Sequence, residues 1–324
     1  MSGDDSRQHL RAVLGVGLTA LIWGGSFAAM KLVVQGGLSV GALLSLRFTL
    51  GGLALGLLAW AFKAKPGSRA LLDSLLLGLV LTVIFWLQTD GLRYTTTSKS
   101  AFITGLYVVF TPLVSLAVGD RLRPSHGIGA LVAALGLFLL VNEPGKPFGG
   151  WNFGDTETLL CAVLCGVHIS MTAHFSRRSD SWTLATGQVV VVAVLSWLVT
   201  PFVPGLPLAD GTRLGGFAGS FAALSSPGVW IPLLFLALLA TALAFYLQSS
   251  QQARLGATEA AILFSLEPVF SAVLAVSGLL PGIRERLTAL QVLGGAIIVS
   301  AMLLAELGPR LLRRLEPPGE DAIG

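Results

Sequence analysis

Ten long runs of mostly apolar residues follow one another along this chain of 324 residues. A helix of about 17 to 25 apolar residues is long enough to cross the ~30 Å hydrocarbon layer of a bilayer. Charged residues make up only 12% of the chain, against roughly 25% in an ordinary soluble domain. We therefore predict an all-α membrane protein with ten transmembrane helices. The runs cover approximately residues 11–33, 39–62, 71–92, 98–118, 125–141, 157–176, 182–203, 229–251, 257–280 and 287–307.

Neither the first run nor the cysteines indicate processing or a cofactor. The first run is too long for a removable signal peptide and lacks a small-residue cleavage site, so we expect it to remain as the first helix. Cys161 and Cys165 stand four residues apart on one predicted helix, a spacing that suits packing better than a disulfide. With no disulfide framework and no metal-ligand spacing, the sequence implies no cofactor and no metal.

Lysine and arginine are distributed unevenly over the segments between the runs. With a cytoplasmic N-terminus, 13 of the 21 basic residues fall in cytoplasmic segments and 6 on the opposite side. Because such an excess marks the cytoplasmic loops of membrane proteins, we expect both termini in the cytoplasm. The basic net charge then requires no nucleic-acid partner. The 13 are Arg7, Arg11, Lys63, Lys65, Arg69, Arg121, Arg123, Arg177, Arg178, Arg254, Arg310, Arg313 and Arg314, and the 6 are Arg93, Lys99, Lys146, Arg213, Arg284 and Arg286.

The chain also contains two similar halves. The stretch GDRLRPSHGIGALVAALGLFLL at 119–140 aligns with RERLTALQVLGGAIIVSAMLL at 284–304. Upstream, SAFITGL aligns with AAILFSL if YVVF is treated as an insertion, and WGGSF aligns weakly with CGVHI. The predicted halves are residues 1–145 and 150–324, each with five crossings.

An odd number of crossings makes the second half enter the membrane from the opposite side, so the predicted repeats are inverted. Many secondary transporters have inverted repeats, with the substrate site near the midplane at matched interruptions of corresponding helices. Pro112 and Pro268 are such matched interruptions. A proline inside a helix removes a backbone hydrogen bond and kinks the helix. We expect both prolines to line one cavity; the alternative is a kink that serves packing only.

At this point the residues resemble a known family. The stretches that carry the resemblance are LIWGGSF, LRF, GLRYTTTSKSAFITGLYVVFTPL and LEPVFSAVL, the last followed by RERLTALQVLGG. In order and spacing they resemble the drug/metabolite transporter (DMT) superfamily and, within it, the EamA-type bacterial transporters, over about residues 13 to 305. The resemblance implies ten helices, cytoplasmic termini and a multi-pass location in the inner membrane. It also implies export or uptake of small polar metabolites, amino acids or xenobiotics.

The sequence departs from the family pattern at two turns. The usual GER-like turn of the second repeat reads LPGIRERL, which is longer. A long loop rich in proline and glycine joins two helices from Pro201 to Pro227. Its RLGGFAGSFAAL segment forms either a short interfacial helix or no regular structure. Neither departure changes the predicted fold.

Four ionisable side chains fall inside the predicted helices. Each costs on the order of 2.5 to 3.5 kcal/mol at a helix centre, so each is a candidate functional residue. Lys31, near a helix end, can instead extend its amine to the interface. Arg47 and Glu267 lie at similar depths from opposite faces and can meet near the midplane, as a structural ion pair or a functional one. His168 is either a hydrogen-bonded packing residue or a cavity residue.

Aromatic and polar neighbours complete the predicted site, because small-molecule pockets combine apolar walls with a few placed polar groups. Alternatively, any one of these residues only packs between helices. The predicted substrate-binding residues are Trp23, Ser26, Phe27, Trp86, Gln88, Thr104, Tyr107, His168, Gln188, Tyr246, Gln248 and Ser265, and the predicted coupling or gating residues are Arg47, Pro112, Glu267 and Pro268.

Together these features predict a secondary transporter that moves a small polar or amphipathic metabolite across the cytoplasmic membrane by alternating access, and we expect export. A passive channel or facilitator is the alternative, although a channel needs rings of like residues. A membrane-embedded enzyme is less well supported, since the chain has no HExxH and no GxxxxGK[ST] motif. Without an ATP-binding domain, concentrative transport requires an ion gradient or exchange, and Glu267 is the one central carboxylate for proton coupling. The sequence predicts no oligomeric state.

Overall fold

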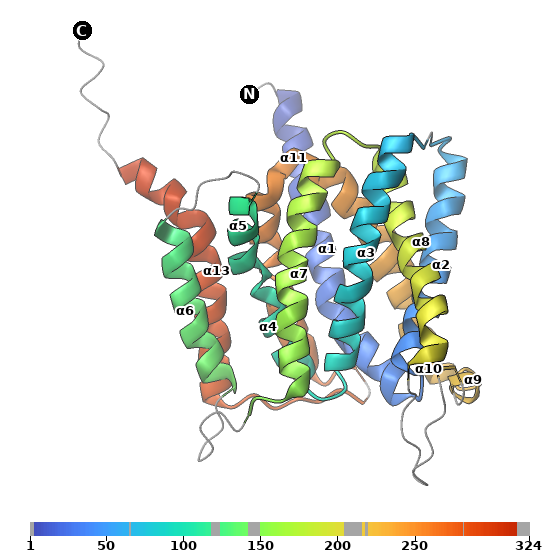
Figure 1. Ribbon diagram of the computed structural model, residues 1–324. Coiled ribbons are helices and arrows are strands. Elements are labelled where there is room, and N and C mark those ends of the chain that lie inside the picture. Colours follow the sequence, from blue (N-terminus) through green and yellow to red (C-terminus); the bar gives the residue numbers. More distant parts are fainter. Residues whose placement is uncertain are drawn as a thin grey trace.

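The protein, seen in a computed structural model, is an assembly of helices that run mostly between two opposite ends of the molecule (Figure 1). The structure describes residues 3–64, 66–117, 124–141, 150–203, 216–217, 220–280 and 282–315, and within these ranges every regular element is a helix. The helices are α1 (Gly3–Gln35), α2 (Val40–Ala61), α3 (Ser68–Gly91), α4 (Thr97–Gly105), α5 (Tyr107–Ala117), α6 (Pro124–Val141), α7 (Phe153–Phe175), α8 (Ser181–Val199), the 3-10 turn η1 (Thr200–Phe202), α9 (Ser220–Ala223), α10 (Pro227–Leu234), the π-helical segment η2 (Phe235–Leu243), α11 (Ala244–Phe264), α12 (Glu267–Ser277) and α13 (Ala289–Leu315).

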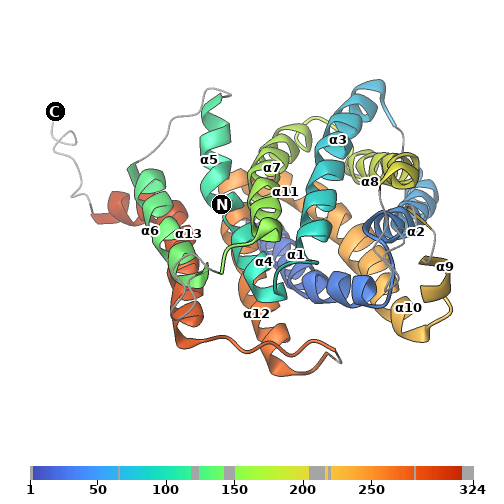
Figure 2. The same ribbon diagram turned by 60° about the horizontal axis from the view of Figure 1, so that its bottom comes forward.

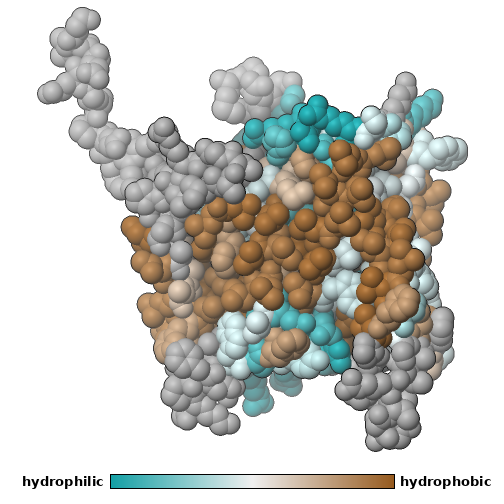
Figure 3. All heavy atoms as spheres, viewed as in Figure 1, coloured by the Kyte–Doolittle hydropathy of each residue, from teal (hydrophilic) through white to brown (hydrophobic). Residues whose placement is uncertain are grey.

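Among the described residues, six helical segments are long and apolar enough to cross a membrane. On the face seen in Figure 3, hydrophobic side chains form a belt between two more hydrophilic ends. Shorter apolar helices accompany the six. The prediction of an all-α membrane protein is thereby confirmed, and the count of ten crossings stays a prediction. The six segments are Arg7–Gln35, Val40–Ala61, Ser68–Gly91, Phe153–Phe175, Ser181–Phe202 and Pro227–Gln252.

One predicted boundary between helices differs in the structure. We expected a loop between the runs that end at 251 and begin at 257, but α11 continues through this segment to Phe264. The sequence QARLGATEAAIL contains no proline, and most of its residues have good helix propensity, so the backbone has little reason to leave the helix. The chain breaks instead at Ser265 and Leu266.

A similar break divides the predicted helix at 98–118 into α4 and α5, at Leu106. Both breaks precede the prolines. Pro112 lies inside α5, which continues through it. Pro268 lies in the first turn of α12, where a missing N–H leaves no intrahelical bond unmade. The break at Ser265–Leu266 therefore lies within the four residues that a kink at Pro268 would affect, whereas the break at Leu106 lies further upstream of Pro112 than a proline kink would put it.

The start of α1 and the end of α13 lie at one end of the molecule, together with the end of α2, the start of α3 and the α7–α8 connection (Figure 1). At the α7–α8 connection Arg178 forms a bidentate ion pair with Asp73 of α3, with N–O distances of 2.6 and 3.0 Å. Hydrogen bonding to the Asp73 carboxylate raises the pKa of Arg178. The pair joins α3 to the turn that follows α7.

The helices pack reciprocally between the two predicted halves. α1 packs against α11 as α7 packs against α3, and α1 packs against α12 as α7 packs against α4 and α5. At the two edges of the molecule α2 packs against α8 and α6 against α13 (Figure 2). Each of these contacts thus has a counterpart in which the predicted halves exchange roles.

The long predicted loop is described only in part. Residues 204–215 and 218–219 lie outside the described residues, and α9 is a one-turn helix within the predicted RLGGFAGSFAAL segment. Asp120 and Arg121 of the first repeat stretch also lie outside the described residues.

Candidate central cavity

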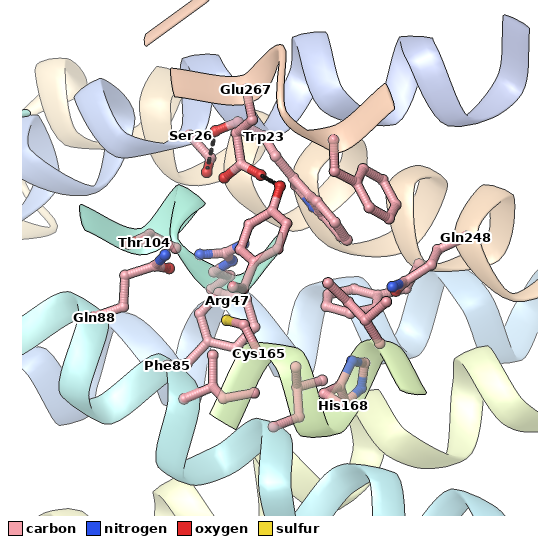
Figure 4. Close-up of a pocket in the computed structure, with 16 residues that line it drawn as sticks. Trp23, Ser26, Arg47, Phe85, Gln88, Thr104, Cys165, His168, Gln248 and Glu267 are labelled. Atoms are coloured by element: carbon pink, nitrogen blue, oxygen red, sulfur yellow. Dashed lines mark hydrogen bonds between the residues drawn. The ribbon is translucent and has the colours of Figure 1, made fainter. Parts of the chain in front are cut away.

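A cavity of ≈ 60 Å³ lies among the long helices, between the two helix breaks. Side chains from α1, α2, α3, α4, α5, α7, α11 and α12 line it (Figure 4). The walls are aromatic and aliphatic, with a few polar groups, as in small-molecule sites. The lining residues are Trp23, Ser26, Arg47, Leu81, Ile84, Phe85, Gln88, Thr104, Tyr107, Cys165, His168, Ile169, Phe245, Gln248, Phe264 and Glu267.

Two of these residues meet where the helices are broken. Tyr107 is the first residue of α5 and Glu267 the first of α12, so each directly follows a break. The Tyr107 hydroxyl donates to Glu267 Oε2 at 3.3 Å, and both residues are buried. This is the one side-chain hydrogen bond of Glu267 among the described residues, so most of the hydrogen-bonding capacity of its carboxylate remains for a ligand in the cavity.

Arg47 of α2 is fully buried and only partly satisfied. Its Nε donates to Thr241 Oγ1 at 2.9 Å, and its Nη1 contacts Met30 Sδ at 3.2 Å. The guanidinium carbon lies 4.5 Å from the ring centroid of Phe85, within range of a cation–π interaction. Its Nη2 has no hydrogen-bond partner among the described residues. A buried donor of this kind is costly unless a ligand accepts from it.

The predicted meeting of Arg47 and Glu267 takes a different form. Both side chains line the cavity, as Figure 4 shows, but no ion pair joins them in the part of the chain that the structure describes. A basic and an acidic side chain therefore face the same small space, each without the other as its direct partner.

His168 lines the cavity, and its imidazole is hydrogen-bonded to Gln188. Its Nε2 lies 2.8 Å from Gln188 Oε1, and Gln188 Nε2 also donates to Ser249 Oγ at 3.5 Å. Gln188 was predicted to bind substrate, but it does not line the cavity. It is a positioning residue for the imidazole.

The predicted site residues divide into two groups. Those that line the cavity are Trp23, Ser26, Gln88, Thr104, Tyr107, His168, Gln248, Arg47 and Glu267. Those that do not are Phe27, Trp86, Gln188, Tyr246, Ser265, Pro112 and Pro268. Phe27 packs in an apolar cluster with α10, and Tyr246 stacks on Trp182 with ring centroids 3.9 Å apart. Trp86 lines a separate cavity with Asp90 and Glu157.

Sequence reasoning missed the apolar half of the lining. Leu81, Ile84 and Phe85 recur at helical spacing with Gln88 on one face of α3. The sequence contained a pattern that could have identified this face. FWLQ at 85–88 is repeated as FYLQ at 245–248 on α11, and the Phe and Gln of both stretches line the cavity. Cys165, which we expected only to pack, also lines the cavity; its sulfur lies 3.8 Å from that of Cys161, and both thiols are free.

One serine has the sequence context of a nucleophile and a structural role instead. GLSVG at 37–41 matches the G-x-S-x-G pattern, which requires a turn between a strand and a helix. Here Ser39 follows α1 and is the N-cap of α2, where its hydroxyl accepts the Ala42 N–H at 3.2 Å and donates to the Gly216 carbonyl at 2.6 Å. The hydroxyl is occupied by the backbone.

Comparisons with known proteins agree with this architecture. The model of the EamA-like transporter family matches residues 10–142 and 152–307. Two similar proteins of Archaeoglobus fulgidus are each named an uncharacterized transporter. One is 30% identical over 308 residues, covering 94% of this chain and 89% of the relative, and the other is 27% identical over 305 residues, covering 93% and 97%.

A solved crystal structure has the same fold. It superposes with a TM-score of 0.65 at 23% sequence identity and covers 94% of this chain and 99% of that one. At this identity the likeness shows the fold alone. The family match, by contrast, extends over nearly the whole chain in two consecutive segments. The chain therefore belongs to the EamA-like transporter family and is a multi-pass membrane protein.

Proposed function

We propose that this protein is a secondary transporter that exports a small metabolite across the cytoplasmic membrane by alternating access. The observation that carries the proposal is the meeting of Tyr107 and Glu267, the first residues after two helix breaks, inside one cavity. Broken helices that meet at a central site are typical of secondary transporters. In this proposal both termini are cytoplasmic and the membrane is the inner membrane.

The two halves, 1–145 and 150–324, rock against each other as inverted five-helix repeats. Three observations support this. The helix contacts are reciprocal, FWLQ recurs as FYLQ on the corresponding helix, and Tyr107 and Glu267 are separated by the same 160 residues as the two Phe-x-x-Gln pairs. A pseudo-twofold relation between the halves accounts for all three.

The substrate carries an anionic group and a cationic or hydrogen-bond-donating group, as amino acids and related metabolites do. The free Nη2 of Arg47 is suited to a carboxylate, since arginine donates in a fixed fork that matches carboxylate geometry. Glu267 is suited to an ammonium group or a proton. The aromatic walls formed by Trp23, Phe85 and Phe245 accommodate an apolar side chain.

The cavity must expand to hold such a molecule. Its volume is only ≈ 60 Å³. Ligand sites are typically several hundred Å³. A conformational change is therefore part of binding, as alternating access requires.

Counterflow in liposomes tests the proposal. A panel of labelled amino acids and cationic dyes is offered to vesicles loaded with unlabelled compound. A transporter gives saturable counterflow, a channel gives flux that does not saturate, and an enzyme alters the compound chemically. Arg47→Gln should raise the half-saturation concentration for a carboxylate substrate roughly ten- to hundredfold. This is the loss of affinity expected when a hydrogen bond between two charged groups is removed.

The matched control is Arg69→Gln, which removes an exposed arginine at the start of α3, far along the helix from the cavity residues. It should leave the half-saturation concentration unchanged. Absence of saturable counterflow for the whole panel, from protein that is correctly folded, would contradict the proposed function.

A further inference from the structure

Helix α4 is completely buried although its sequence, TSKSAFITG, is polar. All nine residues are buried, and the hydroxyls of Thr97, Ser98, Ser100 and Thr104 have no hydrogen-bond partner among the described residues. Buried hydroxyls are nearly always hydrogen-bonded, because a buried polar group without a partner costs about 1–3 kcal/mol of stability. A helix that keeps four such groups requires an explanation beyond packing.

Three of the hydroxyls form a line. Thr97, Ser100 and Thr104 recur at intervals of three and four residues, which places them on one face of the helix. The line ends at the central cavity, where Thr104 and Tyr107 are both part of the lining. Its other end, at Thr97, lies toward the end of the molecule opposite the termini (Figure 1). The hydroxyls thus connect the cavity to that end.

The first residues of α4 are tied down by three separate elements. The Glu285 carboxylate, from the segment between α12 and α13, accepts the backbone N–H groups of Thr97 and Ser98 at 2.5 and 3.0 Å. On another side, Lys99 Nζ pairs with the fully buried Asp155 of α7 at 2.6 Å.

The third tie comes from α1, where Lys31 Nζ donates to the carbonyl of Thr95, just before α4. Each of these bonds is made by a charged group to a partner on a different element. Charge-assisted bonds of this kind are strong when dry, and water can replace them when the site opens. They hold one end of α4 closed without a permanent hydrophobic seal.

We propose that the hydroxyl face of α4 is the outer half of the translocation path. In this structure the path is closed by the bonds that Glu285, Lys99 and Lys31 make around the start of α4. The proposal rests on the proposed transport function and adds the route and its gate. When the ties break, the start of α4 moves away and the four hydroxyls gain water or substrate as partners. A polar solute then leaves the cavity along Thr104, Ser100 and Thr97.

Thiol accessibility tests the path without any transport measurement. Ser100→Cys places a thiol on the hydroxyl face, and Phe102→Cys places one on the opposite side of α4, which packs in an apolar cluster with α13. A membrane-impermeant thiol reagent is applied separately from each side, in intact cells and in inverted vesicles. Mass spectrometry of the digested protein then gives the modified fraction at each position, and the native Cys161, which is buried outside the cavity lining, serves as an internal reference.

Glu285→Ala should accelerate labelling of Ser100→Cys roughly tenfold or more, since it removes two hydrogen bonds to a charged group that hold the closed state. The acceleration should come from the side opposite the termini. Labelling of Phe102→Cys should not change, and Arg286→Ala, the exposed neighbour of Glu285, should have no effect on either position.

Should Glu285→Ala fail to fold, Glu285→Gln keeps one acceptor and should give an intermediate acceleration. Equal labelling of Ser100→Cys and Phe102→Cys, with or without Glu285, would overturn the proposal. Rapid labelling of Ser100→Cys with Glu285 intact would also overturn it, by showing that the path is not closed. Because neither result depends on flux, a failed counterflow assay would count against the transport function and leave the gate to be judged separately.

Discussion

The two halves of the molecule contribute the same walls to the cavity but different chemistry. Phe85 and Gln88 of α3 face Phe245 and Gln248 of α11, so this part of the lining is repeated. At the breaks the halves differ: the first half supplies the phenol of Tyr107, and the second supplies a carboxylate, that of Glu267. The repeated residues shape the space, and the unlike residues give it a donor side and an acceptor side.

The charged groups follow the same division. Arg47 belongs to the first half, whereas Glu267 and His168 belong to the second. A symmetric pair of identical charges would repel in so small a cavity. Divergence of the predicted halves at these positions lets one cavity contain a basic and an acidic side chain. We expect the largest experimental effects where the halves differ or where their relation is broken.

The largest effect concerns orientation. If the halves are inverted with five crossings each, both termini lie on the same side, and the basic residues of the sequence put that side in the cytoplasm. Reporter fusions that fluoresce only in the cytoplasm should be bright at either terminus. A dark C-terminal fusion with normal expression would contradict the inverted five-plus-five arrangement, because the second half would then not return the chain to its starting side.

The next effect concerns Glu267, the residue by which the second half differs most from the first. Glu267→Gln keeps the size of the side chain and should keep the fold, but the amide cannot take up a proton in the relevant range. We expect loss of transport driven by a pH gradient, with exchange of substrate across the membrane retained. The measurement is uptake into vesicles with and without a pH gradient.

Glu157→Gln is the matched control for this experiment, since Glu157 lies on α7 and lines a different cavity. It should transport as the wild-type protein does under both conditions. Normal pH-driven transport by Glu267→Gln would mean that the carboxylate only accepts the Tyr107 hydroxyl and has a structural role.

The sequence predicted the class of protein well because membrane burial leaves long apolar runs that few other folds need. It also singled out Arg47 and Glu267, two ionisable residues that line the central cavity, since they are conspicuous in such runs. It placed the helix breaks at Pro112 and Pro268, whereas the structure breaks at Leu106 and at Ser265–Leu266. The kink rule applies to the proline itself and says nothing of residues such as Gly105 that end a helix without one.

The errors within the site have a common physical cause. Tyr246 and Trp86 adjoin the cavity residues Phe245 and Phe85 in sequence, but a helix turns by about a quarter to a third of a circle per residue, so neighbours face different ways. Composition identifies an aromatic residue, and only the helix phase says where it points. The repeated Phe-x-x-Gln lines carry that phase, because residues three apart share a face.

The smallest expected effect compares two glycines at the contacts between the halves. Gly24 of α1 faces α12, and Gly166 of α7 faces α5; the two are paired by the weak WGGSF–CGVHI alignment. A Cβ on Gly24 would lie 2.7 Å from Phe270 Cβ and 2.9 Å from the Glu267 carbonyl oxygen. A Cβ on Gly166 would lie 3.0 Å from the Thr111 nitrogen, with its next neighbours at 3.2 Å.

Both substitutions to alanine overpack a helix contact, which typically costs roughly 1–3 kcal/mol, and the tighter contact at Gly24 should put Gly24→Ala toward the upper end. Thermal unfolding of the purified variants in detergent should therefore show a larger drop in midpoint for Gly24→Ala than for Gly166→Ala. Gly17→Ala, at a position of α1 where a Cβ meets nothing within 4 Å, is the control and should not lower the midpoint. Equal drops at Gly24 and Gly166 would mean that the two contacts are equally tight, and that the halves are more alike at their glycines than their geometry indicates. Because the Gly24 contact includes the backbone of Glu267, its alanine variant should also impair pH-driven transport more than the Gly166 variant does.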